Sequence, residues 1–384
     1  MTFSGAAISA DGADGGEYGF YAYTSTYSYT TCYSTSSYAV YYVAAGGGGS
    51  GGSVLIDAPS MRGDATVSAD GGAPAGLSTT SSGGGGGGRV GIHVSSTKVP
   101  AEIIFSALGG TNSSSTCGGG AGTIFVNSGT QQTLLVDNAD ANVDSSTYTP
   151  LPADEGLGGV DLFVVRNSHV QVTTYRARRL RLDSSSSISG DELTVTAHNA
   201  SIEGAVTSTS LARMMFATNL DVASTASLEC ASIFITVPIA SIDGDVSSTS
   251  LARLNVAKHL DIASSASLEC AGCLINISTP VLRHAGQLES GSLDVLTRTA
   301  SIEGGVTCTS LARVNALTEL NISSGASVEC TGCAIEINTP ALLHAGQLGF
   351  GGLNVTSNRA RIEGNATWVE RNLPQPQAKE RKQI

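Results

Sequence analysis

The feature that most constrains this chain is that it repeats itself at a fixed spacing. The tetrad Ser-Ile-Glu/Asp-Gly begins at Ser201, Ser241 and Ser301, and a related Arg-Ile-Glu-Gly begins at Arg361. Every interval between consecutive tetrads is a multiple of 20 positions. One turn of many β-solenoids is about 20 residues long, so the spacing itself indicates the architecture.

A longer unit repeats as well. Residues 266–295 and 326–355 match at 19 of 30 positions. Inside each unit, apolar and polar residues alternate over four or five positions, and Gly, Ser-Ser or Thr-Pro interrupts the alternation. A period of two is typical of strands. Strands this short cannot each bury an apolar face alone, so we expect them to stack.

The sequence therefore predicts an all-β fold, a parallel β-helix (β-solenoid) with coils of about 20 residues and Gly-rich corners. Successive coils of such a fold lie about 4.8 Å apart, which would separate copies three coils apart by about 14 Å. The prediction requires Ile202, Ile242 and Ile302 to share one interior column.

Composition divides the chain into four parts. Residues 1–45 are a Tyr/Ser/Thr-rich segment, expected as irregular strand or partial coils, and 46–155 form a Gly-rich β-helix module. Residues 156–366 carry the repeat β-solenoid, and 367–384 form a polar tail that we expect to be disordered. Glycine lets backbones pass closely, so we interpret the glycine blocks as corners between packed turns. A phosphate cradle is disfavoured because no Walker lysine follows any block.

The charge balance restricts the partners. The formal net charge is −12 with only 20 Lys+Arg, which leaves no broad cationic surface, so we expect neither nucleic acid nor membrane insertion. No apolar stretch approaches the roughly 20 residues of a membrane helix, and no signal peptide is visible. Because the chain starts and stops inside repeat-like sequence, we expect a soluble fragment of a longer repetitive secreted protein.

A family resemblance is carried by four segments within residues 46–140, namely GGGGSGGSVLI, VSADGG, GGGGGGRVGIHV and GGGAGTIFV. They resemble the glycine-rich modules of large surface or secreted proteins of microbial eukaryotes, which are similar to pectin-lyase-like β-helices. The resemblance implies a right-handed parallel β-helix and an extracellular or cell-surface location. It implies almost nothing about chemistry, and the Tyr-rich run of residues 1–45 departs from it.

Three classes of function follow. The first hypothesis is a structural or adhesin-like extracellular β-solenoid that presents repeated polar rows to polysaccharide or another surface protein, without catalysis, cofactor or metal. The alternative is a carbohydrate-active lyase or hydrolase acting in a groove along the solenoid. The Asn-Thr-Asp and Asp-Asp signatures of polygalacturonases are absent from the sequence. A third class is ice or crystal-surface binding through Ser/Thr rows such as 207–210. We assign no catalytic residue.

Charged side chains supply the candidate ligand-binding residues. A dense basic stretch alternates partly like a strand and could bind anionic sugars or form a solvated face. Two further sets recur with the repeats, one acidic and one basic, and lie about ten residues apart, half a coil, so we expect them on different faces. Solvated charged ladders are the preferred interpretation of these two sets, and a ligand-binding stripe is the alternative. The candidates are Arg176, Arg178, Arg179 and Arg181, then Glu203, Asp243 and Glu303, then Arg213, Arg253 and Arg313.

Cysteine and histidine form a pattern that occurs twice. Zinc needs four ligands, whereas each copy of Cys-x2-Cys-x10-His offers three, and copies about 14 Å apart cannot share one ion. Cys230, Cys270 and Cys330 each follow an apolar residue by two, so they should point inward. We therefore predict buried core thiols, in preference to local disulfides or metal ligands. The two copies are Cys270, Cys273 and His284, and Cys330, Cys333 and His344.

One acidic run alternates like a calcium loop. Asn138, Asp140, Asn142 and Asp144 place oxygen ligands at every second position. The run lacks the central glycine and the twelfth-position glutamate of that loop, so an ordinary turn is the preferred interpretation.

Overall fold

The fold is all-β. The computed structural model describes residues 1–15, 17–25, 38–75, 83–95, 99–111, 118–129, 131–141, 147–151 and 159–368. The regular elements in these ranges are β-strands, and the described residues contain no helix that could cross a membrane. They divide into two compact units, Met1–Gly190 and Asp191–Ile384. Of the predicted polar tail, only positions 367 and 368 are described.

Six strands of the first unit pair in parallel in two sheets around one core. Val67, Ile92 and Ile124, drawn from both sheets, are among its buried side chains. Arg89 pairs with Ser53 of the preceding coil, so the coils of this Gly-rich module are longer than the predicted length of about 20 residues. One sheet holds β1 (Ala6–Ser9), β5 (Ala65–Ser68) and β7 (Ile103–Ser106), and the other β4 (Ser53–Ala58), β6 (Arg89–Val94) and β8 (Thr123–Ser128).

The Tyr-rich segment contains a separate antiparallel pair. Strand β2 (Glu17–Ser25) pairs with β3 (Tyr38–Ala45), and the register runs from Glu17 opposite Ala45 to Ser25 opposite Tyr38. The residues between the two strands lie outside the described ranges.

Extended glycine segments run between the strands of the first unit. The N–H groups of Gly48 and Gly51 donate to carbonyls of the next coil at 3.0 and 2.9 Å, three residues apart in each chain segment. The N–H of Gly49 donates instead to Ala13, at 2.7 Å. A period of three is that of polyproline II rather than of a strand. Together, the extended segments between the strands form what we call the glycine bundle, residues 10–15, 46–52, 69–73, 83–88, 107–110 and 118–122.

Steric contacts explain why the bundle is made of glycine. A Cβ at Gly85 would overlap the backbone of Gly49, and one at Gly72 would overlap the backbone of Ala13. The close backbone approach predicted for the glycine blocks is therefore present. It occurs along straight segments that hydrogen-bond on two sides, rather than only where the chain turns.

The remaining coils of the first unit are shorter than those of the Gly-rich module. Asp161 pairs with Arg179 and His169 with Ser187, and the two partners are 18 residues apart in both pairs. Strand β9 runs antiparallel to β8 and parallel to β11. The strands are β9 (Gln131–Asp137), β10 (Thr149–Pro150), β11 (Val160–Val165), β12 (His169–Gln171), β13 (Thr174–Leu182) and the start of β14 (Ser187–Ile202), which continues into the second unit.

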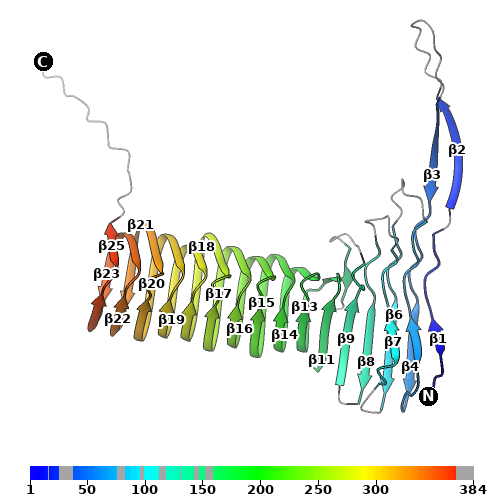
Figure 1. Ribbon diagram of the computed structural model, residues 1–384, viewed down its shortest axis with the longest axis horizontal. Helices are drawn as coiled ribbons and strands as arrows, with labels where there is room; N and C mark the ends of the chain where they lie inside the picture. The colour runs from blue at the N-terminus through cyan, green and yellow to red at the C-terminus, as the bar shows by residue number, and fades with distance from the viewer. Residues whose placement is uncertain are drawn as a thin grey trace, which may run out of the picture. The chain divides into compact units, whose positions relative to one another are not determined.

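The second unit is a regular parallel solenoid (Figure 1). Each strand pairs in parallel with the strand one coil further on. Its strands are β15 (Ala205–Val222), β16 (Ser227–Ile242), β17 (Asp245–Ile262), β18 (Ser267–His284), β19 (Gln287–Ile302), β20 (Gly305–Ile322), β21 (Ser327–Asn338), β22 (Ala341–His344), β23 (Gln347–Thr356), β24 (Arg359–Ile362) and β25 (Asn365–Trp368).

Like positions align in columns, as predicted. The register places Val222, Ile242, Ile262, His284 and Ile302 in one buried column. The N–H of Ala223 donates to the carbonyl of Ile202 at 2.8 Å, just as that of Asp243 donates to Val222, so Ile202 begins the same column. The shared interior column of Ile202, Ile242 and Ile302 is confirmed.

The coils are not equal in length. Asp245, Ser267, Gln287 and Gly305 occupy the same position in successive coils. They bound a long coil (245–266), a middle coil (267–286) and a short coil (287–304), each two residues shorter than the one before. The next repeat has the same three lengths.

The first repeat of the second unit has only two coils. Between Ala205 and Asp245, a long coil (205–226) is followed directly by a short one (227–244). The first interval between tetrads is shorter than the later ones because this repeat lacks its middle coil.

The tetrad glycines lie at corners of the second unit. A Cβ at Gly244 would overlap the carbonyl oxygens of Ala223 and Ala226 in the preceding coil, and one at Gly304 would overlap that of Gly286. The Glu/Asp-Gly corner thus nests against the corner of the preceding coil, which begins Ala-Ser at Ala223 and Ala-Gly at Ala285. This is the physical reason that the tetrad keeps its glycine.

Candidate functional site

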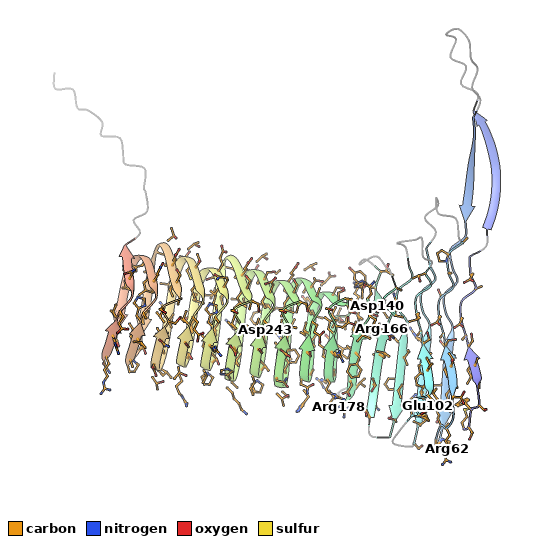
Figure 2. All side chains as sticks on the ribbon, in the orientation of Figure 1. Arg62, Glu102, Asp140, Arg166, Arg178 and Asp243 are labelled. Atoms are coloured by element: carbon orange, nitrogen blue, oxygen red, sulfur yellow. A yellow bond between two sulfur atoms is a disulfide. The ribbon has the colours of Figure 1, made fainter. Side chains whose placement is uncertain are left out.

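The dense basic stretch surrounds a buried carboxylate. The side chain of Asp161 has no solvent exposure. Arg178 donates from Nε and Nη2 to its two oxygens at 2.8 and 2.6 Å, and Arg179 donates from Nη2 at 2.6 Å. Burial alone would raise the pKa of Asp161, but hydrogen bonds and positive charge from the two arginines outweigh it and lower that pKa. Figure 2 shows Arg178 on this part of the chain.

The other two arginines of the stretch point to solvent. Arg176 and Arg181 are exposed, and neither forms an ion pair with a described residue. Consecutive Arg178 and Arg179 both face Asp161, so the alternation of β13 is broken between them. The structure therefore brings together two of the four predicted ligand residues and leaves the other two free to meet an anionic group.

The acidic set lies at the corners of the second unit. Glu203, Asp243 (labelled in Figure 2) and Glu303 are half-buried and each follows a buried isoleucine. Ser301 donates to Glu303 Oε1 at 3.3 Å, and Arg283 approaches the same oxygen at 3.5 Å. The carboxylates of Asp243 and Glu303 are therefore held by neighbours within their own or the adjacent coil.

The basic set shares one column but is not contiguous in it. Phe234 lies between Arg213 and Arg253, and the guanidinium of Arg253 is 5.6 Å from its ring centroid, a cation–π contact. Arg313 donates from Nε to Glu336 of the next coil at 2.9 Å. Among the described residues, no hydrogen bond or ion pair joins these arginines to the acidic set.

The cysteine prediction is wrong for two pairs. Cys270 is bonded to Cys273 and Cys330 to Cys333, with Cα atoms 5.3 and 5.2 Å apart, inside the range that a disulfide spans. The reason is a bulge, where three residues after Cys270 oppose two in the preceding strand and Gly272 has a φ of 74°. This turn brings the second cysteine back onto the first.

Two other cysteines are buried free thiols; this was predicted for Cys230, whereas Cys308 was not singled out. Cys230 and Cys308 have no disulfide partner. Burial raises the pKa of Cys230 to about 11 and also raises that of Cys308. Cys32 and Cys117 lie outside the described residues.

The histidines of the repeated motif belong to the core rather than to a cluster with the cysteines. His284 and His344 are 2% and 0% exposed and occupy the isoleucine column. His284 Nε2 is 3.0 Å from the carbonyl of Gly305, whereas its Nδ1 has no hydrogen-bond partner. Burial lowers the pKa of both imidazoles. In the described ranges, no three potential metal ligands cluster.

The first residue of the run that alternates like a calcium loop, Asn138, has a structural role. Asn138 is fully buried, and its Oδ1 accepts a hydrogen bond from the N–H of Gly109 at 2.8 Å, while its Nδ2 donates to Gly119 at 3.4 Å. It thus ties together two segments of the glycine bundle. Asp140 is exposed, and Asn142 and Asp144 lie outside the described residues.

A groove on the glycine bundle was missed by sequence reasoning. Its volume is about 320 Å³. Ser53, Arg89 and Thr123 stand in register along it, and Tyr148, 40% exposed, is a fourth side chain in its wall. Its lining residues, which we call the glycine groove, are 51–53, 86–89, 120–123 and 148–150.

The lining of the glycine groove contains a glycine that packing does not require. A Cβ at Gly86 would meet only the carbonyl oxygen of Gly120, 3.9 Å away. Its neighbour Gly85 has no such room. A glycine in open space in the lining of a groove keeps the backbone accessible to whatever enters it. The sequence does carry a feature that indicates this groove. It is the period of three in residues 83–89, which leaves Gly83, Gly86 and Arg89 facing outward.

Comparisons with known proteins found no relative of this chain. No protein-family model matches the chain, and searches of curated proteins and of solved structures found no similar protein.

Proposed function

We propose that this protein is a non-catalytic, extracellular or cell-surface β-solenoid that presents repeated polar columns to a polysaccharide or to a partner surface. One observation carries the proposal, a polar outward column that continues in register through seven successive coils. Its members are Thr207, Glu229, Ser247, Glu269, Glu289, Thr307 and Glu329.

Local hydrogen bonds orient three of the four carboxylates of this column. Ser227 donates to Glu229 and Ser267 donates to Glu269, each at 2.8 Å, and Ser327 donates to Glu329 at 3.0 Å. The same serine, two residues before the glutamate, recurs at the start of the coil that follows each long coil. Equally oriented acceptors at multiples of about 4.8 Å suit a ligand that is itself repetitive. Weak contacts at such a spacing add by multivalency.

Deleting one complete repeat tests the proposal. Asp245 and Gly305 are equivalent positions, so removing residues 245–304 takes out three coils while keeping the register. The deletion removes three of the seven column members but leaves the first unit intact. We expect an unchanged β-type circular dichroism spectrum and affinity for a bound polysaccharide reduced by about tenfold or more.

Two results would contradict the proposal. One is undiminished affinity of the deletion variant, which would place binding at a single local site. The other is the absence of binding by the full chain to acidic and neutral polysaccharides and to cell surfaces. A matched control is Glu363→Gln, a corner carboxylate outside the column, which should leave affinity unchanged.

The glycine groove favours a second candidate, a carbohydrate-active enzyme. The groove has a volume of about 320 Å³, and Arg89 in its lining would neutralise a carboxylate bound there. Incubation with polyuronates and neutral glycans would reveal new reducing ends or unsaturated products. If the groove is an active site, Gly86→Phe should abolish that activity, whereas Gly86→Ala should preserve it.

A further inference from the structure

One interior column of the second unit alternates between serine and cysteine and then breaks its own pattern. Cys308 and Cys330 are register partners in adjacent strands β20 and β21. Among the described residues of this column, they are the one place where two cysteines are neighbours. The column consists of Ser208, Cys230, Ser248, Cys270, Ser290, Cys308, Cys330 and Phe350.

The pattern break stacks a free thiol against a disulfide. Cys308 is unpaired and fully buried, and its sulfur lies 3.4 Å from the hydroxyl of Ser290 in the preceding coil. In the following coil, Cys330 is bonded to Cys333, whose sulfur is 3.6 Å from the carbonyl oxygen of Cys308. Register partners on one face of a parallel sheet lie about 4.8 Å apart, inside the Cα separation that a disulfide accepts.

We propose that Cys308 and the Cys330–Cys333 disulfide form an intramolecular thiol–disulfide exchange site. The thiolate of Cys308 attacks Sγ of Cys330, so a Cys308–Cys330 bond forms while the Cys330–Cys333 bond breaks. The electron pair leaves on Cys333, which takes up the proton that Cys308 released. Nothing is oxidised or reduced overall, so no external reagent is required.

The exchange changes what the disulfide does. A Cys330–Cys333 bond closes a bulge inside one coil, whereas a Cys308–Cys330 bond staples two successive coils and closes the longer loop from 308 to 330. A longer closed loop constrains the unfolded chain more. Because the thiolate is the nucleophile and burial raises the pKa of Cys308, exchange should be slow at neutral pH and faster as the pH rises.

The same column holds two built-in controls. Cys230 is a buried thiol whose register partners, Ser208 and Ser248, offer no disulfide to attack. The Cys270–Cys273 disulfide is flanked by Ser248 and Ser290, so no thiol is stacked against it. Exchange is therefore expected at one of the two disulfides only.

The test maps disulfides by mass spectrometry in the full chain carrying Cys32→Ser and Cys117→Ser. The protein is incubated without added thiol at about pH 9, quenched in acid, alkylated after denaturation and digested. We expect a peptide pair linked through Cys308 and Cys330, with alkylation gained at Cys333 as it is lost at Cys308. Cys230 should stay alkylated and Cys273 unalkylated.

Two variants decide the outcome. Serine already occupies the equivalent positions 208 and 248, so Cys308→Ser should fold and should abolish alkylation of Cys333. Ser248→Cys places a thiol against Cys270 and should create alkylation at Cys273. The proposal is overturned if Cys333 is never alkylated in the chain that keeps Cys308, or if it is alkylated equally in Cys308→Ser. Because the readout is connectivity, neither result depends on the proposed function.

Discussion

At the scale of single residues, the second unit tolerates two imidazoles in a column of isoleucines. His284 and His344 take positions that Ile242, Ile262 and Ile302 fill in other coils. A buried imidazole without a full set of hydrogen bonds is stable only when it is neutral. These two side chains therefore make the stability of the solenoid depend on pH.

We predict that stability falls as the pH falls through the ordinary histidine range. The pKa of each imidazole is lowered in the folded state, so below about pH 6.5 the unfolded chain binds protons that the folded chain does not. Each histidine should then remove up to about 1.4 kcal/mol of unfolding free energy per pH unit. Urea denaturation from about pH 7.5 to pH 5 measures the slope. The double variant His284→Ile/His344→Ile should flatten it, and an unchanged slope would contradict the assignment.

A second prediction concerns the buried carboxylate of the first unit. Asp161→Asn leaves Arg178 and Arg179 without their counter-charge and replaces charged hydrogen bonds with neutral ones. We expect a loss of about 2 kcal/mol in unfolding free energy, moderated because both arginines reach solvent. The control Arg176→Gln, at an exposed position of β13, the strand that carries both arginines, should cost less than about 0.5 kcal/mol. Equal losses from the two substitutions in denaturant titrations would refute the role of Asp161.

At the scale of elements, the glycine bundle offers a test between two adjacent residues. A Cβ at Gly85 would overlap the backbone of Gly49, whereas a Cβ at Gly86 has open space. We predict that Gly85→Ala destabilises by about 3 kcal/mol or more, because the packed backbones cannot move apart cheaply. Gly86→Ala should be neutral or stabilising by up to about 1 kcal/mol. Thermal denaturation compares them, and similar melting temperatures would show that the segments are not packed as described.

The same elements show how far sequence reasoning reaches. Alternation and the regular spacing predicted stacked strands, and the isoleucine columns followed, because an apolar residue repeated at one coil position can only face inward. The unequal lengths of the coils were not predictable from spacing alone, since the interval between tetrads gives only the summed length of the coils in one repeat. The disulfides were missed because a bulge overrides alternation at Cys270. The partnership of Asp161 with the arginines was missed because it joins distant positions of the sequence through pairing of β11 and β13.

At the scale of the whole molecule, stability and recognition should both scale with the number of coils. Each coil of the second unit contacts chiefly the coils before and after it. Removing a complete repeat therefore removes interfaces between coils, and the one new interface it creates is of a kind already present in the chain. The repeat between the first two tetrads already lacks its middle coil while the register continues. This is why the deletion of residues 245–304 is expected to fold.

The solenoid requires like positions to stack one coil apart, and a spin-label distance measures this stacking most directly. Labels at positions 229 and 329 are five coils apart, and labels at 207 and 329 are six coils apart. With the free cysteines replaced by serine, pulsed electron paramagnetic resonance should give backbone separations of about 24 and 29 Å, a difference of about one coil spacing. Separations that do not grow by about 4.8 Å per coil would contradict the stacked solenoid.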